Sequence, residues 1–342
     1  MINKRFWGKK EQKDICLFTL HNDNGMEVDI SDFGSTIVSI RCPSSEGTLA
    51  DVVLGFDELE GYLEEHPYFG STVGRYASRI FQGKFEIDGI IYQLPVNDGS
   101  NCLHGGIKGF DKYIWDTEVL GNQLVTRRIS LDGEEGFPGN LLVEVAYVLT
   151  NKNELIIEYS ASTDKKTALN LTDHSYFNLQ GGDKNILDHE LTIYSSKIAL
   201  LNENSIPTGE FLQVENTPFD FRSAQRVGDR MKMSHPQFEK TKSFDHSFAL
   251  ENNGNLIKAA TLLDPQSNRR LTVYTTEPSV HLYTGNFLNG TTGKGGKEYS
   301  DFYALCLETQ HFPNSLNQDN FPSTILNPGE TFYSKTIYAF SW

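Results

Sequence analysis

Residues 167–180 read TALNLTDHSYFNLQ, a stretch apolar enough for a buried strand although it carries a histidine in its middle. Side chains of an extended segment alternate between two faces, so Thr172, His174, Tyr176 and Asn178 are predicted to share one face. The opposite face is predicted to carry the intervening residues Leu171, Asp173, Ser175, Phe177 and Leu179. A buried imidazole, phenol and amide in a row suit a polyhydroxylated ligand, but a histidine in an apolar strand is more often a satisfied core residue.

Three further stretches have the same character, and together they favour a binding site. They are NCLHGG at 101–106, FDHSF at 244–248 and LCLETQ at 305–310. Each places an ionisable side chain among apolar or small neighbours. An unpaired carboxylate such as Glu308 would be costly to bury among its apolar neighbours at 304–307.

The composition and the turn signals predict an all-β protein. Hydrophobic residues make up 38% of the 342 residues and aromatic residues 12%, which is typical of a globular chain rich in strand formers. Apolar runs at 15–20 and 26–30 flank a turn, and further hairpins are predicted at these turns: Asp88-Gly89, residues 151–153 and residues 252–254.

Helix signals are few, and they leave the strand prediction dominant. One short helix is expected within residues 57–65, and another is expected from a cap at Ser223 through Met231. Neither a repeat nor a linker divides the chain. Residues 1–342 are therefore predicted to form a single antiparallel domain with two large sheets face to face.

Charge and cysteine content exclude several classes of partner. The formal net charge of −15 disfavours nucleic acid and anionic membranes, and no apolar run approaches the roughly 20 residues of a membrane helix. Residues 1–14 lack the apolar core of a secretory signal. The four cysteines form no CxxC pair, so we expect reduced thiols in the cytoplasm and neither a metal nor another cofactor.

One glycine-rich stretch resembles a phosphate-binding loop but lacks the residues that such a loop requires. Residues 290–297 read GTTGKGGK, and Gly296 stands where a P-loop requires lysine. Metalloprotease HExxH and hydrolase GxSxG motifs are absent from the sequence. The stretch is therefore interpreted as a flexible loop.

The stretches described above resemble the signature of the galactose mutarotase (aldose 1-epimerase) family. The NCLHGG stretch and the GFDKYIW that follows at 109–115 match the family pattern NxLHGG…GFD…W. Other matches follow in the family's order: GFPGN at 136–140, NLTDHSYFNL at 170–179, FDFR at 219–222, DHSF at 245–248, YTGNF at 283–287 and LETQ at 307–310. Each motif is weak alone, but their order across nearly the whole chain is specific.

The resemblance implies a large antiparallel β-sandwich of the supersandwich type and an enzyme that interconverts the α and β anomers of galactose, and of glucose. By family role His174 is the general acid and Glu308 the general base. Arg79 and His104 bind the ring-oxygen side of the sugar, Asp245 binds hydroxyls and Tyr176 lies alongside. The candidate binding set also includes Ser78, Ser175 and His281.

These residue types fit the chemistry of mutarotation. A base takes the proton of the C1 hydroxyl while an acid protonates the ring oxygen, the C1–C2 bond rotates, and the ring closes on the other face. A carboxylate is a suitable base, and an imidazole, with an unperturbed pKa of about 6.5, can supply a proton near neutrality. The reaction needs no metal, cofactor or covalent intermediate.

Departures from the family pattern leave the preferred sugar open. The family usually has Asn where Ser78 stands and Gln where His281 stands, both beside the sugar in relatives. Asn314 replaces a common Asp in the closing motif and is interpreted as structural. The role of Arg75 stays open between an ion pair and binding.

The sequence leaves three alternative functions open. A glycoside hydrolase would use Asp245 and Glu308 as its carboxylate pair. A sugar-binding protein on the same fold would bind without accelerating the reaction. A hexose 6-phosphate epimerase would require an additional basic cluster, which the sequence does not place near the motifs.

Overall fold

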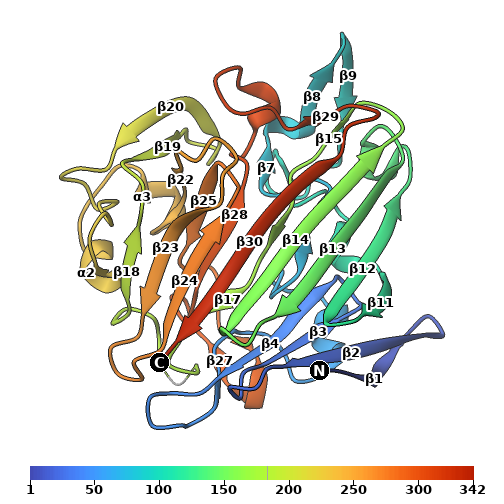
Figure 1. Cartoon of the computed structure of the whole chain (residues 1–342). Helices are drawn as coiled ribbons and strands as arrows, with labels where there is room; N and C mark the ends of the chain where they lie inside the picture. Colours follow the sequence, from blue (N-terminus) through green and yellow to red (C-terminus); the bar gives the residue numbers. More distant parts are fainter. Residues whose placement is uncertain (183) are drawn as a thin grey trace.

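The computed structural model describes residues 1–182 and 184–342, and strands dominate it (Figure 1). The largest sheet has nine strands, in the order β11 (Asp116–Leu120), β12 (Gln123–Ser130), β13 (Leu141–Leu149), β14 (Glu154–Thr163), β30 (Phe332–Ser341), β24 (Arg270–Thr275), β23 (Ile257–Leu263), β18 (Glu190–Ile193) and β21 (Gln225–Arg226). A six-stranded sheet follows the order β17 (Tyr176–Phe177), β28 (Leu305–Gln310), β25 (Ser279–Tyr283), β22 (Asp245–Ala249), β19 (Lys197–Leu201) and β20 (Pro207–Gln213).

A third sheet and several short ribbons complete the fold. The third sheet contains β1 (Ile2–Lys10), β2 (Lys13–His21), β3 (Glu27–Ser31), β4 (Thr36–Cys42) and β5 (Ala50–Asp51). The two-stranded ribbons pair β7 (Arg79–Ile80) with β10 (Cys102–Leu103), β8 (Lys84–Ile87) with β9 (Ile90–Gln93), β16 (Thr172–Asp173) with β6 (Thr72–Val73), β15 (Thr167–Ala168) with β29 (Ile325–Leu326), and β26 (Thr291–Thr292) with β27 (Glu298–Tyr299).

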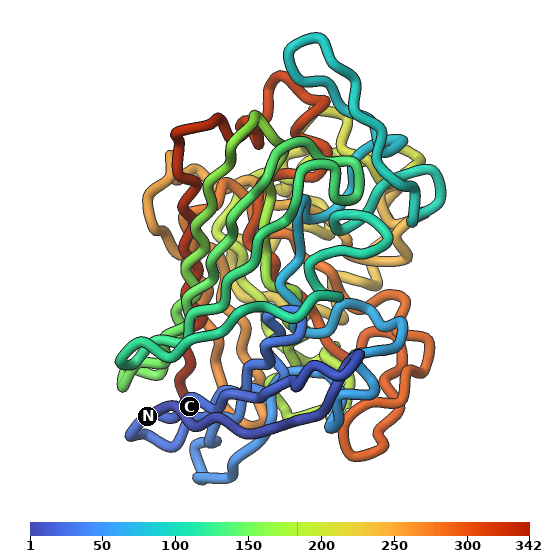
Figure 2. Tube along the Cα trace, turned by 90° about the vertical axis from the view of Figure 1, so that its right-hand side faces the viewer, coloured from blue at the N-terminus to red at the C-terminus, as the bar shows by residue number. Residues whose placement is uncertain are grey.

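The helices within the described residues are short. They are α1 (Leu59–Leu63), α2 (Val227–Met231), α3 (Phe238–Thr241) and the single 3₁₀ turns η1 (Phe81–Gly83), η2 (Phe110–Lys112), η3 (Glu134–Gly136), η4 (Lys294–Gly296) and η5 (Ser315–Asn317). No described helix has the length and apolar character needed to cross a membrane. Figure 2 shows the strands of the nine-stranded sheet running side by side, and in both views the β8–β9 hairpin projects at the end opposite the chain termini.

Alternation along the strands joins the two large sheets through one core and leaves the other face of the six-stranded sheet for polar groups. Leu305 and Leu307 of β28 belong to the hydrophobic cluster that also contains Val143 and Val145 of the nine-stranded sheet. Cys306 lies between these two leucines, and Glu308 and Gln310 follow it at every second position. These three side chains therefore point to the opposite face. The β-sandwich class predicted from the sequence is confirmed.

Two of the predicted hairpins have the expected pairing, and the third does not. β8 pairs with β9 across Asp88-Gly89, where both residues have positive φ, and β13 pairs with β14. The hairpin predicted at 252–254 is wrong, because β22 pairs with β19 and β25 whereas β23 pairs with β18 and β24. That turn carries the chain from the six-stranded to the nine-stranded sheet.

Two other predictions need correction. The helix predicted from Ser223 begins later, at Val227, and its cap position is occupied by Arg226 without a side-chain capping bond. The 167–180 stretch is not one strand: β15, β16 and β17 each pair with a different partner, so the segment crosses between sheets. Local sequence cannot foresee this, because the partners of all three pieces lie far away in the chain.

Asp173 is a buried acid on the β16 ribbon with few compensating contacts. Its Oδ1 accepts hydrogen bonds from the Ser175 amide at 3.1 Å and the Tyr338 hydroxyl at 3.3 Å. Its Oδ2 has no hydrogen-bond partner among the described residues. Burial raises the pKa of Asp173 from 3.8 to about 7, against these hydrogen bonds.

The raised pKa of Asp173 predicts a stability gain for Asp173→Asn at high pH. The contribution of Asp173 to stability is fully present at a pH below its pKa in the unfolded chain, where the acid is neutral. This contribution is lost as the pH rises through the higher pKa that Asp173 has in the folded chain. We expect the variant to exceed the wild type in free energy of unfolding by about 2–4 kcal/mol at pH 8, and by less at pH 5. Urea denaturation at both pH values measures this gap, with the exposed Asp116→Asn as control; a gap independent of pH would contradict the prediction.

Candidate active site

A pocket of about 210 Å³ opens on the face of the six-stranded sheet that points away from the common core. Its size is below the usual range for drug-sized ligands, and it suits a single small polar molecule. Its lining consists of Pro67, Tyr68, Ser78, Arg79, Leu103, His104, His174, Tyr176, Asp245, His281, Tyr283, Phe287 and Glu308.

Strand register places four of these side chains in one block. His281 of β25 lies directly across from Glu308 of β28, and Tyr283 lies across from Asp245 of β22. Residues opposite each other in an antiparallel sheet present their side chains to the same face. The neighbouring residues Leu282 and Leu307 point into the core. The acids and the histidine are thus brought together by the same alternation that builds the core.

A short ribbon supplies the opposite wall. Arg79 of β7 pairs with Leu103 of β10, which puts Ser78 and His104 at adjacent ends of the ribbon. Both end residues have positive φ, 62° for Ser78 and 51° for His104. The Ser78 amide donates to His104 Nδ1 at 3.2 Å and the His104 amide donates to the Ser78 carbonyl at 3.1 Å. These reciprocal bonds hold a backbone conformation that is uncommon for residues other than glycine.

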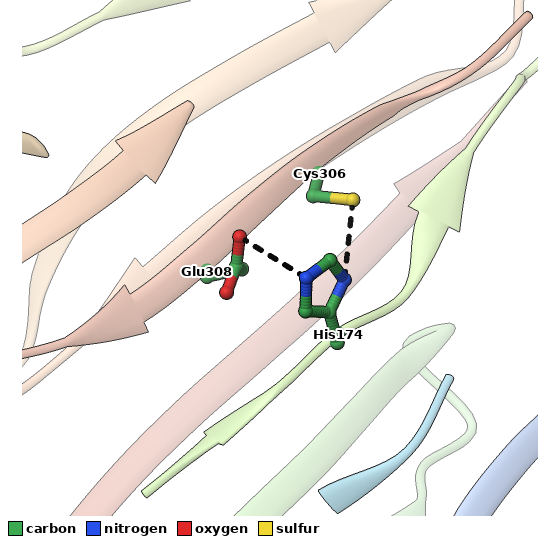
Figure 3. Close-up of side chains that lie close together, drawn as sticks. All are labelled: His174, Cys306 and Glu308. Atoms are coloured by element: carbon green, nitrogen blue, oxygen red, sulfur yellow. Dashed lines mark hydrogen bonds and ion pairs between the residues drawn. The ribbon is translucent and has the colours of Figure 1, made fainter. Parts of the chain in front are cut away.

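His174 stands between a carboxylate and a thiol (Figure 3). Its Nε2 is 3.7 Å from Glu308 Oε1, and its Nδ1 is 3.5 Å from Cys306 Sγ. All three residues are at most 5% exposed. An imidazole and a carboxylate this close, at the wall of a pocket, can give and take protons on one bound molecule.

Aromatic rings fix the orientation of His174. Tyr176 stacks on the imidazole with centroids 5.0 Å apart, and Tyr68 stacks at 6.0 Å. The His104 ring meets it edge-on at 5.3 Å. Burial lowers the pKa of His104 well below its usual value, and repulsion from His174 and Arg79 adds to this effect. His104 is therefore neutral at pH 7 and offers the pocket a neutral hydrogen-bonding group.

Asp245 is held as an anion by two partners. Its Oδ1 is 2.7 Å from His281 Nε2, and its Oδ2 is 3.5 Å from an Arg79 nitrogen. Burial alone would raise the pKa of Asp245, but Arg79 and the His281 bond outweigh it and hold that pKa well below the usual range. Arg79 is itself anchored through Nε to Asp98 at 2.7 Å. The result is a fixed acceptor group suited to sugar hydroxyls.

All of the predicted site residues except Ser175 line this pocket. Ser175 is 1% exposed and lies outside the lining, because it follows His174 in the chain and takes the opposite face, as the alternation of the stretch requires. Asn178, which was predicted to share the face of His174, instead donates to the carbonyl groups of Lys184 and Tyr303.

The lining also contains residues that the sequence reasoning missed. Pro67 and Tyr68 carry no motif, and a positive φ of 59° at Tyr68 cannot be seen in the sequence. Leu103, Tyr283 and Phe287 fall within the quoted motifs, so motif membership was a usable signal for them.

Arg75, whose role the sequence left open, is a structural residue. It is 2% exposed and is not part of the pocket lining. Its guanidinium donates to groups of three chain segments: Ser130 Oγ and carbonyl with the Leu131 carbonyl, the carbonyls of Pro138 and Gly139, and Thr167 Oγ1. Burial lowers the pKa of Arg75 to about 10, which still leaves it charged at neutral pH.

A larger hollow of about 720 Å³ borders the glycine-rich loop, but its cations are already paired. Lys294 Nζ lies 2.6 Å from Asp51 Oδ2 and donates to the carbonyls of Val38 and Val53. Arg269 donates to backbone carbonyls of the surrounding loops. The loop at 290–297 is anchored through Lys294, and it does not form a phosphate site.

His174, Cys306 and Glu308 are also a group of donors that could hold a metal ion, with ligand atoms within 4.8 Å of one another. The sequence did not indicate this cluster, because His174 and Cys306 are 132 positions apart. Metal ligation requires a thiolate, yet burial raises the pKa of Cys306 well above its usual value, and the nearby carboxylate of Glu308 adds to this. The thiol and the carboxylate also face different ring nitrogens, so the arrangement fits proton transfer better than metal binding.

Comparison with known proteins identifies the family. The aldose 1-epimerase family profile matches residues 17–339. The chain is 46% identical to galactose mutarotase of Bos taurus over 95% of its length and 93% of the relative, and 38% identical to aldose 1-epimerase of Escherichia coli K12 over 95% and 94%. The chain belongs to the aldose 1-epimerase family.

Solved structures of this family have the same fold. The galactose 1-epimerase of Lactobacillus acidophilus superposes with a TM-score of 0.87 at 30% identity, covering 100% of this chain and 98% of that one. Like other aldose 1-epimerases, the protein is an isomerase that interconverts sugar anomers. The resemblance noted in the sequence is confirmed.

The contacts of Arg75 predict a loss of stability in Arg75→Lys. A lysine has three donors on one atom and cannot reach acceptors in three separate chain segments, so buried carbonyls lose their partners. We expect the free energy of unfolding to fall by about 2–4 kcal/mol. Urea denaturation measures it, and Arg127→Lys, at a partly exposed ion pair, is the control with a change below about 1 kcal/mol. Equal changes in both variants would contradict the structural role.

Proposed function

We propose that this aldose 1-epimerase acts on galactose and glucose, with His174 and Glu308 as its acid–base pair. The observation that carries the proposal is the 3.7 Å approach of His174 Nε2 to Glu308 Oε1 within a pocket of about 210 Å³. The two groups lie close enough to act on the C1 hydroxyl and the ring oxygen of one pyranose, because these oxygens share the same carbon.

Ring opening moves two protons. Glu308 takes the proton of the C1 hydroxyl, and the C1–O bond to the ring oxygen breaks as protonated His174 gives its Nε2 proton to that oxygen. C1 becomes an aldehyde. After rotation about C1–C2, neutral His174 takes the proton back from the hydroxyl that attacks C1, and Glu308 returns its proton to the aldehyde oxygen. Atoms and charge balance without an oxidant or a co-reactant.

The remaining lining residues serve binding. Asp245 accepts hydrogen bonds from sugar hydroxyls, while Arg79 and His104 bind on the ring-oxygen side and Tyr176 packs against His174. Ser78 and His281 lie beside the bound sugar. Charged groups form the stronger hydrogen bonds, so Asp245 and Arg79 contribute most to affinity.

Two rival activities find less support in the same geometry. A glycoside hydrolase that used Asp245 with Glu308 would need a carboxylate free to act, whereas Asp245 is bound on both oxygens by Arg79 and His281. A phosphorylated sugar would need cationic partners. Arg79 is the one Lys or Arg residue among the lining residues described, and it already faces two carboxylates.

The proposal extends to the location, the domain organisation and the partner of the protein. We infer a cytoplasmic enzyme of one domain over residues 1–342 whose partner is a monosaccharide. The four cysteines support this setting, because all of them are buried and unpaired in the described chain, as expected where thiols stay reduced.

Replacing the base provides the test. Freshly dissolved α-D-galactose should change its optical rotation faster with the wild-type enzyme than in buffer alone. Glu308→Gln keeps the shape of the side chain but cannot accept a proton, so we expect the catalysed rate to fall by about 10²–10⁴-fold. The control is Glu86→Gln at an exposed position of β8. A Glu308→Gln enzyme of wild-type rate would refute the assignment of the base.

A further inference from the structure

Three buried side chains form a line that ends at the pocket. Ser247 Oγ is 2.9 Å from His281 Nδ1, and His281 Nε2 is 2.7 Å from Asp245 Oδ1. Ser247 is 2% exposed and His281 5%. Asp245 and His281 line the pocket, whereas Ser247 lies behind them.

The sheet register explains why these residues meet. Ser247 of β22 lies directly across from His281 of β25. Asp245 is two positions before Ser247 on β22 and shares its face. The intervening His246 points into the aromatic core beside Phe219, at 4.7 Å between ring centroids. A cross-strand neighbour and a diagonal neighbour therefore both reach the His281 ring.

For a neutral His281 ring, the hydrogen-bond inventory gives the direction of each bond. An ionised carboxylate only accepts, so His281 Nε2 carries the proton that is shared with Asp245. In the neutral ring Nδ1 then has a lone pair, and the Ser247 hydroxyl donates to it. Both ring nitrogens are used by the protein. His281 consequently has no free nitrogen with which to bind a sugar hydroxyl.

The set has the same members as a serine hydrolase triad but the reverse arrangement. In a triad the serine faces the substrate and the carboxylate lies behind the histidine. Here the carboxylate is at the pocket, and the serine is the member outside the lining. A nucleophilic role for Ser247 is therefore excluded by its position.

We propose that Ser247 is a positioning residue that, through His281, holds Asp245 in place to bind the sugar. The proposal rests on the binding role given to Asp245 above. Ser247 fixes the rotation of the His281 ring, which in turn fixes Oδ1 of Asp245, while Arg79 approaches Oδ2. Arg79 is anchored to Asp98, so the carboxylate is held from both sides.

Ser247→Ala should weaken sugar binding more than it slows the chemistry. The variant leaves Nδ1 unpaired and lets the His281 ring turn, so Asp245 loses its fixed position. We expect KM for galactose to rise about three- to tenfold, the effect of one lost hydrogen bond, with kcat within about twofold. Ser247→Thr keeps a hydroxyl and should restore KM.

The control is Ser279→Ala on β25. Ser279 is equally buried on the same sheet face, but its hydroxyl donates to the Gln310 carbonyl rather than to His281. Its KM should stay within about twofold of the wild type, which separates the loss of a buried hydroxyl from the loss of the His281 partner. A Ser247→Ala enzyme with wild-type KM, or equal KM changes in the two alanine variants, would overturn the proposal.

A spectroscopic measurement tests the same bond without turnover. Correlation spectra of ¹⁵N-labelled protein should show His281 protonated at Nε2 and unprotonated at Nδ1. The Nδ1 resonance should move downfield in Ser247→Ala and not in Ser279→Ala. A proton on Nδ1 in the wild type, or an unmoved resonance in Ser247→Ala, would overturn the inference. If the wild type failed to accelerate mutarotation, the proposed sugar function would fail, and this spectrum would still report on Ser247.

Discussion

The site depends on the alternation of side chains in the six-stranded sheet. In β22, β25 and β28 the residues that pack towards the nine-stranded sheet alternate with residues on the opposite face, and four of the latter line the pocket: Asp245, His281, Tyr283 and Glu308. This constraint lets a carboxylate such as Glu308 be buried next to Leu307 without entering the core. A shift of one residue in register would exchange Leu307 and Glu308 and destroy the core and the site together.

Burial of polar groups is tolerated here because the groups satisfy one another. Asp245 is surrounded by an imidazole and a guanidinium, and its charge persists in spite of burial. Asp173, with one oxygen unpaired among the described residues, is not compensated in this way, and burial raises its pKa. The two acids differ in their neighbours rather than in their depth, since both are buried.

The proposed proton transfer needs a histidine with a defined orientation, and the fold supplies this orientation through stacking. Tyr68 and Tyr176 hold the His174 ring, and Cys306 meets Nδ1, so Nε2 faces Glu308. His281, a departure from the family pattern, has both nitrogens bound to protein groups. We therefore propose that His281 acts on sugar binding through Asp245.

The sequence by itself determined the strand-rich class, the hairpins at Asp88-Gly89 and residues 151–153, and the ordered motifs that contain His104, Asp245 and Glu308, because turn chemistry, alternation and motif order are local properties. Only the tertiary structure decided that the turn at 252–254 joins different sheets, that Arg75 is structural and that Tyr68 lines the pocket. The physical reason is that strand partners and loop contacts are chosen by residues far away in the chain, so the distance between His174 and Glu308 has no local signature.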